Sequence, residues 1–141
     1  MNIHSPRKNR GVTLMELMTV MLIVGILAAI SIPSYRAYNV RTHRAAAKAC
    51  LSEAAQYMER YYTSELKYED ATIALGCETE GDLNLYYTIE PTDATQRTYT
   101  LSAVPKGAQA KFDVDCGTMT LDETGKRGAG DNTAATISTC W

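Results

Sequence analysis

The sequence predicts an α+β fold in which one long N-terminal helix packs on an antiparallel sheet of three to four strands. An apolar run over residues 12–32 continues with helical periodicity to residue 63, which predicts the helix. Apolar and polar residues then alternate with a period of two between positions 85 and 122, which predicts the strands. All four cysteines follow the apolar run, so disulfides are expected to hold the irregular parts of this single small domain.

The run from Val12 to Ile32 has the length and flanks of a membrane-spanning helix. It contains 21 residues with one formal charge, on Glu16, and residues 1–11 before it contain three bases and no acid. A helix of this length measures about 31 Å, close to the ~30 Å hydrocarbon core of a bilayer. A basic flank followed by a long apolar helix predicts a membrane-targeted N-terminus.

Glu16 departs from an ordinary transmembrane helix, because a carboxylate at a bilayer centre costs roughly 2.5–3.5 kcal/mol. One interpretation is that Glu16 lies shallow and reaches the lipid headgroups. The other is that it binds a positive partner. Cleavage after Gly11 would leave an α-amino group on Val12, and the amine of a neighbouring copy would then neutralise the carboxylate.

Residues 11–17, Gly-Val-Thr-Leu-Met-Glu-Leu, closely resemble the prepilin peptidase site of type IV pilins and of type II secretion pseudopilins, whose pattern is G-F-T-L-I-E-L. The residues that follow, through Gly25 and Pro33, are also similar to a pilin N-terminal helix. Val12 stands in place of the usual Phe and Met15 in place of Ile, and both remain apolar.

This resemblance implies cleavage between Gly11 and Val12, N-methylation of Val12, and a role for Glu16 in filament assembly. It also implies a bend or a locally loosened stretch between Gly25 and Pro33 that lets subunits pack in a filament. From the residues alone, Pro33 predicts a kink or simply the exit of the helix from the membrane.

The resemblance divides the chain into three segments. Residues 1–11 are a leader, residues 12–33 a hydrophobic transmembrane and assembly helix, and residues 34–141 a globular domain. The formal net charge of −2 would become −5 when the leader is removed, so no overall basic excess indicates a nucleic-acid-binding protein. Before assembly the N-terminus would be cytoplasmic and the globular domain periplasmic; the subunit would then join a pilus at the cell surface.

Residues 34–63 are expected to continue the helix, with an apolar side at Val40, Ala47, Leu51, Ala54, Met58 and Tyr61. The apolar half before it would protrude, because it has no core of its own chain to pack against. Four bases and no acid occur between positions 36 and 48, at Arg36, Arg41, Arg44 and Lys48. These bases are solvated or contact headgroups, or they pair with acidic surfaces of neighbouring subunits; DNA binding is a third option.

The second half of the chain is expected to contain a connecting loop and the sheet. Glycines and charges interrupt residues 64–84 and predict the loop. Strands are predicted over residues 85–90, 98–104, 112–116 and 117–122. Alternation places Tyr99, Leu101 and Ala103 on one face and Thr98, Thr100 and Ser102 on the other.

Four cysteines allow three pairings, of which Cys50–Cys77 with Cys116–Cys140 is favoured because each bond joins neighbours in chain order. The second bond resembles the disulfide-bounded C-terminal region of pilins and would staple the Gly-, Thr- and Ala-rich residues 124–141. All four would lie in an oxidising periplasm, where disulfides persist. Residues 116–122 and the terminal Cys-Trp pair further resemble PilE-type minor pilins of Gram-negative bacteria.

The sequence offers no catalytic residues, and neither a cofactor nor a metal is expected. It contains no G-x-S-x-G, phosphate-binding loop, H-E-x-x-H or Cys-x-x-Cys motif. His43 lies among bases, so a solvated histidine is expected. Asp122, Glu123 and Asp131 match no calcium loop and are expected to form a solvated acidic turn. The nine tyrosines are expected to pack between helix and sheet.

The resemblance implies a structural subunit, a minor pilin of a type IV pilus, with expected roles in pilus biogenesis, twitching motility and adhesion. The expected partners are other major and minor pilins through the N-terminal helix, the prepilin peptidase and methyltransferase, the inner-membrane assembly machinery and the inner membrane itself. Three alternatives remain open: a type II secretion pseudopilin, a pilin that binds DNA for uptake, and a membrane-anchored periplasmic module that forms no polymer.

Overall fold

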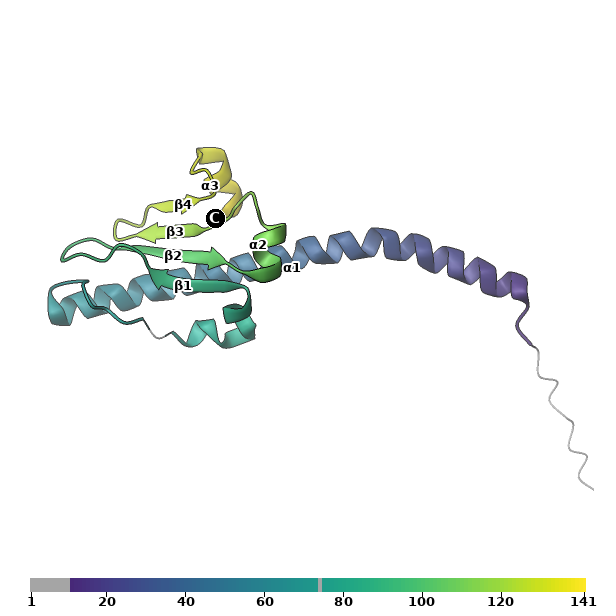
Figure 1. Cartoon of the computed structure of the whole chain (residues 1–141), viewed down its shortest axis with the longest axis horizontal. Helices are drawn as coiled ribbons and strands as arrows, with labels where there is room; N and C mark the ends of the chain where they lie inside the picture. Colours follow the sequence, from purple (N-terminus) through teal and green to yellow (C-terminus); the bar gives the residue numbers. More distant parts are fainter. Residues whose placement is uncertain (1–10, 74) are drawn as a thin grey trace, which may run out of the picture. The chain divides into compact units, whose positions relative to one another are not determined.

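The computed structural model describes residues 11–73 and 75–141 (Figure 1). The predicted leader, apart from Gly11, lies outside these residues. The chain forms two compact units, one that ends at Ala37 and one that begins at Tyr38. The predicted start of the globular domain, at residue 34, lies four residues before this division.

The long helix α1 spans Leu14–Glu65, 52 residues, and contributes to both units. The sequence predicts it from Val12 to about Thr63, so each end differs by two residues. Gly25 and Pro33 both lie inside the helix, which continues on either side of them.

The C-terminal unit contains a four-stranded antiparallel sheet with the strand order β1-β2-β3-β4 (Figure 1). The strands are β1 (Tyr87–Pro91), β2 (Thr100–Pro105), β3 (Met119–Asp122) and β4 (Arg127–Ala129). Ile89 pairs with Ala103, and Leu101 pairs with Leu121, so apolar residues lie side by side on one face. The predicted α+β fold is therefore confirmed.

The core lies between one side of α1 and one face of the sheet. The residues of α1 that are buried are Ala47, Cys50, Leu51, Ala54 and Met58. Their spacing of three and four residues keeps them on one side of the helix, as the periodicity predicts. The sheet contributes the buried side chains of Tyr87, Ile89, Leu101, Ala103, Met119 and Leu121. Ser102, predicted for the opposite face, is also buried, and its hydroxyl donates to the carbonyl of Glu90.

The strand predicted over residues 112–116 is wrong, because this region begins with the end of helix α2 (Gly107–Phe112) and continues as a turn. A strand would bury Phe112 and Val114 and expose Asp113. The structure does the reverse, with Phe112 50% exposed, Val114 71% exposed and Asp113 3% exposed. The buried Asp113 carboxylate makes an ion pair and hydrogen bonds that are described below. These interactions favour the turn over the strand that the alternating pattern predicts.

Other short helices were not predicted from the sequence. The loop over residues 64–84 contains the 3₁₀ helix η1 (Gly76–Glu78), and η2 (Glu80–Leu85) follows it. Residues 124–141 contain β4 and helix α3 (Ala134–Cys140). Thr133 caps α3 by accepting a hydrogen bond from the backbone N–H of Thr136.

Leu66, directly after α1, has a φ of +58°, a conformation that glycine adopts without steric cost at the end of a helix. Its side chain is 73% exposed, so its loss removes little packing. We expect Leu66→Gly to raise the free energy of unfolding by about 1 kcal/mol. Urea unfolding of the full chain in detergent measures this, with Leu66→Ala as the control that keeps the strained Cβ. A lower stability for Leu66→Gly than for Leu66→Ala would contradict the prediction.

Candidate functional site

The apolar side chains of the predicted membrane segment, residues 12–33, are exposed except for Ala28, which is half-buried. Within the described residues, α1 is the helix long and apolar enough to cross a membrane, by length and composition. Its most apolar 18-residue window has a mean hydropathy of 2.3, and none of that window is buried. Leu14, Met15 and Ile30, for example, are 77%, 75% and 68% exposed. Such a surface requires lipid or the helices of other protein chains to cover it.

Glu16 lies in the first turn of this helix, and Gly11, Val12 and Thr13 precede the helix as exposed, non-helical backbone. The Thr13 hydroxyl accepts a hydrogen bond of 3.2 Å from the Glu16 backbone N–H, so Thr13 caps the helix. A threonine three residues before a glutamate is the sequence signature of a helix start, so residues 13–16 contain a local signal for this cap. A carboxylate at this position also interacts favourably with the positive end of the helix dipole.

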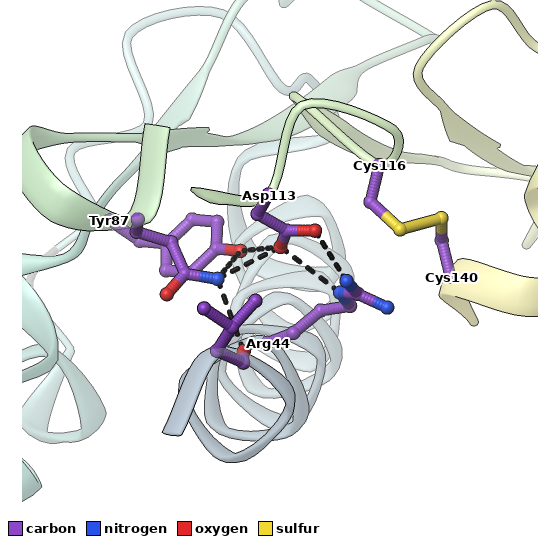
Figure 2. Close-up of polar contacts among 7 residues, drawn as sticks. Arg44, Tyr87, Asp113, Cys116 and Cys140 are labelled. Carbon is purple, nitrogen blue, oxygen red and sulfur yellow. Dashed lines mark hydrogen bonds and ion pairs between the residues drawn. A yellow bond between two sulfur atoms is a disulfide. The ribbon is translucent and has the colours of Figure 1, made fainter. Parts of the chain in front are cut away.

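In the C-terminal unit, a buried polar anchor joins α1 to the turn after α2 (Figure 2). Arg44 of α1 forms a two-pronged ion pair with the carboxylate of Asp113, with Nε 3.1 Å from Oδ2 and Nη2 bonded to Oδ1. The Asp113 side chain is 1% exposed and that of Arg44 is 15% exposed. A two-pronged pair of this kind fixes the mutual orientation of both side chains.

Two further side chains complete the anchor. The Tyr87 hydroxyl donates to Asp113 Oδ2 at 3.1 Å, and the buried Gln109 amide donates to the same oxygen at 2.8 Å. The Gln109 amide also donates to the backbone carbonyl of Val40 in α1, at 3.1 Å. Burial, and next the negative charge of Asp113, raise the pKa of Tyr87, so its hydroxyl remains a neutral donor.

Two disulfides also stabilise the C-terminal unit. Cys50 of α1 is bonded to Cys77 of η1, and Cys116 is bonded to Cys140 at the end of α3. These are the two pairs that the sequence favours. Trp141 follows the second bond, and its indole N–H donates to the carbonyl of Gly128 in β4 at 2.9 Å. The C-terminal segment is therefore held by a covalent bond to the turn before β3 and by a hydrogen bond to β4.

We expect replacement of both Cys116 and Cys140 by alanine to lower the free energy of unfolding by about 3–4 kcal/mol, because the bond closes a loop with a sequence separation of 24 residues. Urea unfolding of the full chain in detergent measures the loss, with Ser138→Ala as the control beside the bond. An unchanged unfolding midpoint in the double variant would show that the C-terminal segment holds its structure without this bond.

The bases of residues 36–48 do not form one free positive surface. Arg44 is neutralised by Asp113, and the Lys48 ammonium donates to the backbone carbonyl of Trp141 at 3.2 Å. Arg41 is exposed. The interpretation of these bases as uniformly solvated is therefore wrong for Arg44 and Lys48, since both are half-buried against the C-terminal half of the chain.

His43 is not the solvated histidine expected from its basic neighbours. Its ring stacks on Tyr86, with 3.6 Å between the ring centroids, and it is half-buried. Since Tyr86 directly follows η2, the stack holds the end of this 3₁₀ helix on α1. No local sequence pattern predicts this contact, because the two residues are distant in sequence.

Of the tyrosines expected to pack between helix and sheet, Tyr35 and Tyr38 do not, since each is 67% exposed. Tyr68, Tyr87 and Tyr99 belong to the core, and the hydroxyls of Tyr68 and Tyr99 both donate to the carboxylate of Glu59 on α1. Burial, and next the hydrogen bond to Glu59, raise the pKa of Tyr68 to about 12.

The three acids weighed as a calcium site do not converge on one point. Asp122 accepts hydrogen bonds from Thr124 and from the backbone N–H of Lys126, Glu123 accepts from the backbone N–H of Tyr99, and Asp131 accepts from the backbone N–H of Thr133. The bond from Thr124 is the main cause of a lowered pKa at Asp122. Within the described residues, no group of three potential metal ligands is close enough to hold an ion.

Two family models match the chain. The first, described as "Type IV minor pilin ComP, DNA uptake sequence receptor", matches residues 33–120. The second, the prokaryotic N-terminal methylation motif, matches residues 6–32. Together they cover the apolar helix and most of the C-terminal unit.

Known proteins agree with these matches. The type IV major pilin protein PilA of Myxococcus xanthus is 36% identical over 73 residues, which are 52% of this chain and 33% of PilA. A fimbrial protein of Dichelobacter nodosus is 32% identical over 111 residues, 77% of this chain and 69% of that protein. The crystal structure of the Neisseria meningitidis non-core minor pilin PilV has a similar fold, with a TM-score of 0.50 at 22% identity over 69% of this chain and 93% of PilV.

Three features agree with both the matched models and the relatives. They are the exposed apolar segment of α1 with Glu16 in its first turn, the antiparallel sheet in the C-terminal unit, and the disulfide that closes the C-terminal segment. The chain therefore belongs to the type IV pilin family.

Proposed function

We propose that this chain is a minor pilin that is cleaved between Gly11 and Val12, methylated on Val12 and built into a type IV pilus. The exposed apolar surface of α1 before Pro33 carries this proposal, because a helix that no part of its own chain covers must pack in lipid or against other helices. The inner membrane would hold the subunit before assembly, with its N-terminus in the cytoplasm and residues 34–141 in the periplasm. In the filament, the same surface would pack against the helices of other pilins.

Glu16 gives the assembly its direction in this proposal. Its carboxylate lies in the first turn of α1 and is exposed. The new amine on Val12 of the neighbouring subunit would neutralise it and so remove the penalty of an isolated charge in apolar surroundings. Prepilin peptidase, its methyltransferase activity and the inner-membrane assembly machinery are the partners that this processing requires. The filament would then serve pilus biogenesis, twitching motility and adhesion.

The experiment that tests this proposal is the mass of the N-terminal peptide, taken from the native membrane and from sheared surface filaments. A peptide that begins at methylated Val12 in the filaments is expected. A chain that still begins at Met1 in cells with active prepilin peptidase would favour the membrane-anchored module. Loss of protein secretion rather than of pili in a deletion strain would favour a type II secretion pseudopilin.

A second candidate function is DNA uptake, since the model that matches residues 33–120 describes a DNA uptake sequence receptor. The full chain in detergent would then retard duplex DNA in a gel, and its affinity would fall steeply with salt because phosphate contacts release counterions. Arg41 and Lys111, both exposed, are bases available for such contacts. Equal retardation of DNA duplexes of every sequence would indicate contacts with the phosphate backbone alone. No retardation of DNA at low salt would exclude this function.

A further inference from the structure

The turn that follows α2 exposes two apolar side chains as a consequence of the buried anchor. Asp113 turns inward to pair with Arg44, and its neighbours Phe112 and Val114 therefore turn outward, where they are 50% and 71% exposed. Phe112 is the one phenylalanine of the whole chain. Large apolar side chains that are exposed at neighbouring positions mark a surface that binds an apolar partner.

Bases accompany these apolar side chains. Lys106 directly precedes α2 and Lys111 lies in its last turn, and both are exposed. The Lys111 ammonium lies 5.8 Å from the centre of the Phe112 ring. Together, residues 38–48 and 106–115 contain five bases and two acids, a local positive excess in a chain whose formal net charge is −2. Exposed apolar groups beside bases are typical of surfaces that bind anionic lipid.

This surface lies at the end of the C-terminal unit that the chain connects to the predicted membrane segment. Gln109 of α2 donates to the carbonyl of Val40, two residues after the unit begins at Tyr38. Val40 follows Ile32, the last residue of the apolar run, by eight helical residues, or at most about 12 Å. The headgroup layer occupies about 5–8 Å of that distance. The backbone beside α2 is therefore held within roughly 7 Å of the headgroups, whatever the orientation of the unit.

An anionic membrane fits this surface better than DNA does. A membrane supplies both an apolar layer for Phe112 and Val114 and phosphates for the bases, whereas a DNA duplex supplies only the phosphates on its outer surface. Lysine side chains reach headgroups while their methylene stems lie along apolar surface. Tyr38, 67% exposed at the start of the unit, adds the kind of aromatic side chain that is enriched at membrane interfaces.

We infer that a lipid-facing surface of the C-terminal unit binds the anionic phospholipids of the membrane that holds the chain. Its residues are Tyr38, Arg41, Lys106, Lys111, Phe112 and Val114. Phe112 and Val114 enter the headgroup layer, and the three bases pair with lipid phosphates. This inference rests on the proposed function for its membrane setting, but not on filament assembly. Extraction of the subunit into a pilus then has to break these contacts as well as remove α1 from the bilayer.

The experiment measures how closely the turn after α2 approaches lipid when the full chain is reconstituted in vesicles. Phe112→Trp places a fluorophore in the turn, and Val114→Trp is a second probe there if the first variant does not fold. The vesicles contain brominated phosphatidylcholine, which quenches nearby tryptophans, either alone or at about two parts to one with the anionic phosphatidylglycerol. The emission of Trp141, measured in the parent chain, is subtracted. We expect quenching of the added tryptophan to be at least about threefold stronger with the anionic lipid.

Two controls separate lipid binding from the mere closeness of the membrane segment. Gln96→Trp is the matched probe, because Gln96 is exposed in the loop between β1 and β2, at the end of the sheet opposite to α2. Its tryptophan should be quenched weakly and equally in both kinds of vesicle. Replacement of Arg41, Lys106 and Lys111 together by glutamine should reduce the quenching of Phe112→Trp in anionic vesicles to the level in phosphatidylcholine alone, as should high salt.

Each outcome bears on the inference. Stronger quenching with anionic lipid that requires the three bases supports it. Equal quenching of Phe112→Trp in the two kinds of vesicle, equal quenching of Gln96→Trp and Phe112→Trp, or no effect of the triple substitution would overturn it. If the triple substitution abolishes retardation of duplex DNA while quenching is independent of anionic lipid, the inference is overturned in favour of DNA binding. Quenching that depends on anionic lipid, in a chain that never enters sheared filaments, would leave the inference standing and reject the proposed function instead.

Discussion

Substitution of Glu16 by alanine is expected to remove the chain from surface filaments while leaving it in the membrane. The exposed apolar surface from Val12 to Ile32 is unchanged by this substitution, and a charge is removed from it, so insertion is preserved. The carboxylate that would pair with the amine of the neighbouring Val12 is lost. Even 1.4 kcal/mol of lost pairing reduces incorporation roughly tenfold, and an apolar setting makes the loss larger.

The measurement is the ratio of the chain in sheared filaments to the chain in the membrane, by immunoblot. Glu65→Ala is the matched control, because Glu65 is an exposed glutamate at the other end of the same helix. Glu16→Gln keeps the shape without the charge and should fail as alanine does. Normal recovery of Glu16→Ala in filaments would remove Glu16 from the assembly mechanism.

Substitution of Asp113 by alanine is expected to lower the free energy of unfolding of the C-terminal unit by about 3–5 kcal/mol, a large fraction of the stability of a small domain. The loss is large because Arg44, Tyr87 and Gln109 all direct donors at the Asp113 carboxylate. Without it, a nearly buried guanidinium and two polar groups would be left without this acceptor. Urea unfolding of the full chain in detergent measures the change.

Two variants show whether the buried charge causes this loss. Asp115→Ala removes an exposed carboxylate two residues away, and we expect a change within about 0.5 kcal/mol. Arg44→Met combined with Asp113→Leu removes both charges and should cost less than Asp113→Ala alone. If the double variant is the less stable of the two, the anchor contributes through its packing rather than through its charges.

Sequence patterns predicted those parts of the fold that local periodicity determines. The buried residues of α1 from Ala47 to Met58 repeat at helical spacing, and the buried residues Leu101 and Ala103 alternate along β2. Both patterns need only the residues of one element, so a single sequence contains them. The family motif of residues 11–17 is local for the same reason.

Contacts between distant residues decided the parts that were not predicted. Residues 112–116 alternate like a strand, yet Asp113 turns inward because Arg44, 69 residues earlier, pairs with it. The stack of His43 on Tyr86 likewise joins two segments that no local pattern connects. The helix cap of Thr13 is different, because the threonine three residues before Glu16 is a local signature of a helix start.

The two disulfides also set how the C-terminal unit would respond to mechanical load. Cys50–Cys77 and Cys116–Cys140 enclose sequence separations of 27 and 24 residues, and a pull on the chain cannot extend either loop. Together they withhold about 180 Å of extended chain. A pull along α1 therefore reaches η1 directly through a covalent bond, and the short strands are not the first elements to bear it. A filament subunit with these two bonds would extend little under tension until the disulfides are reduced.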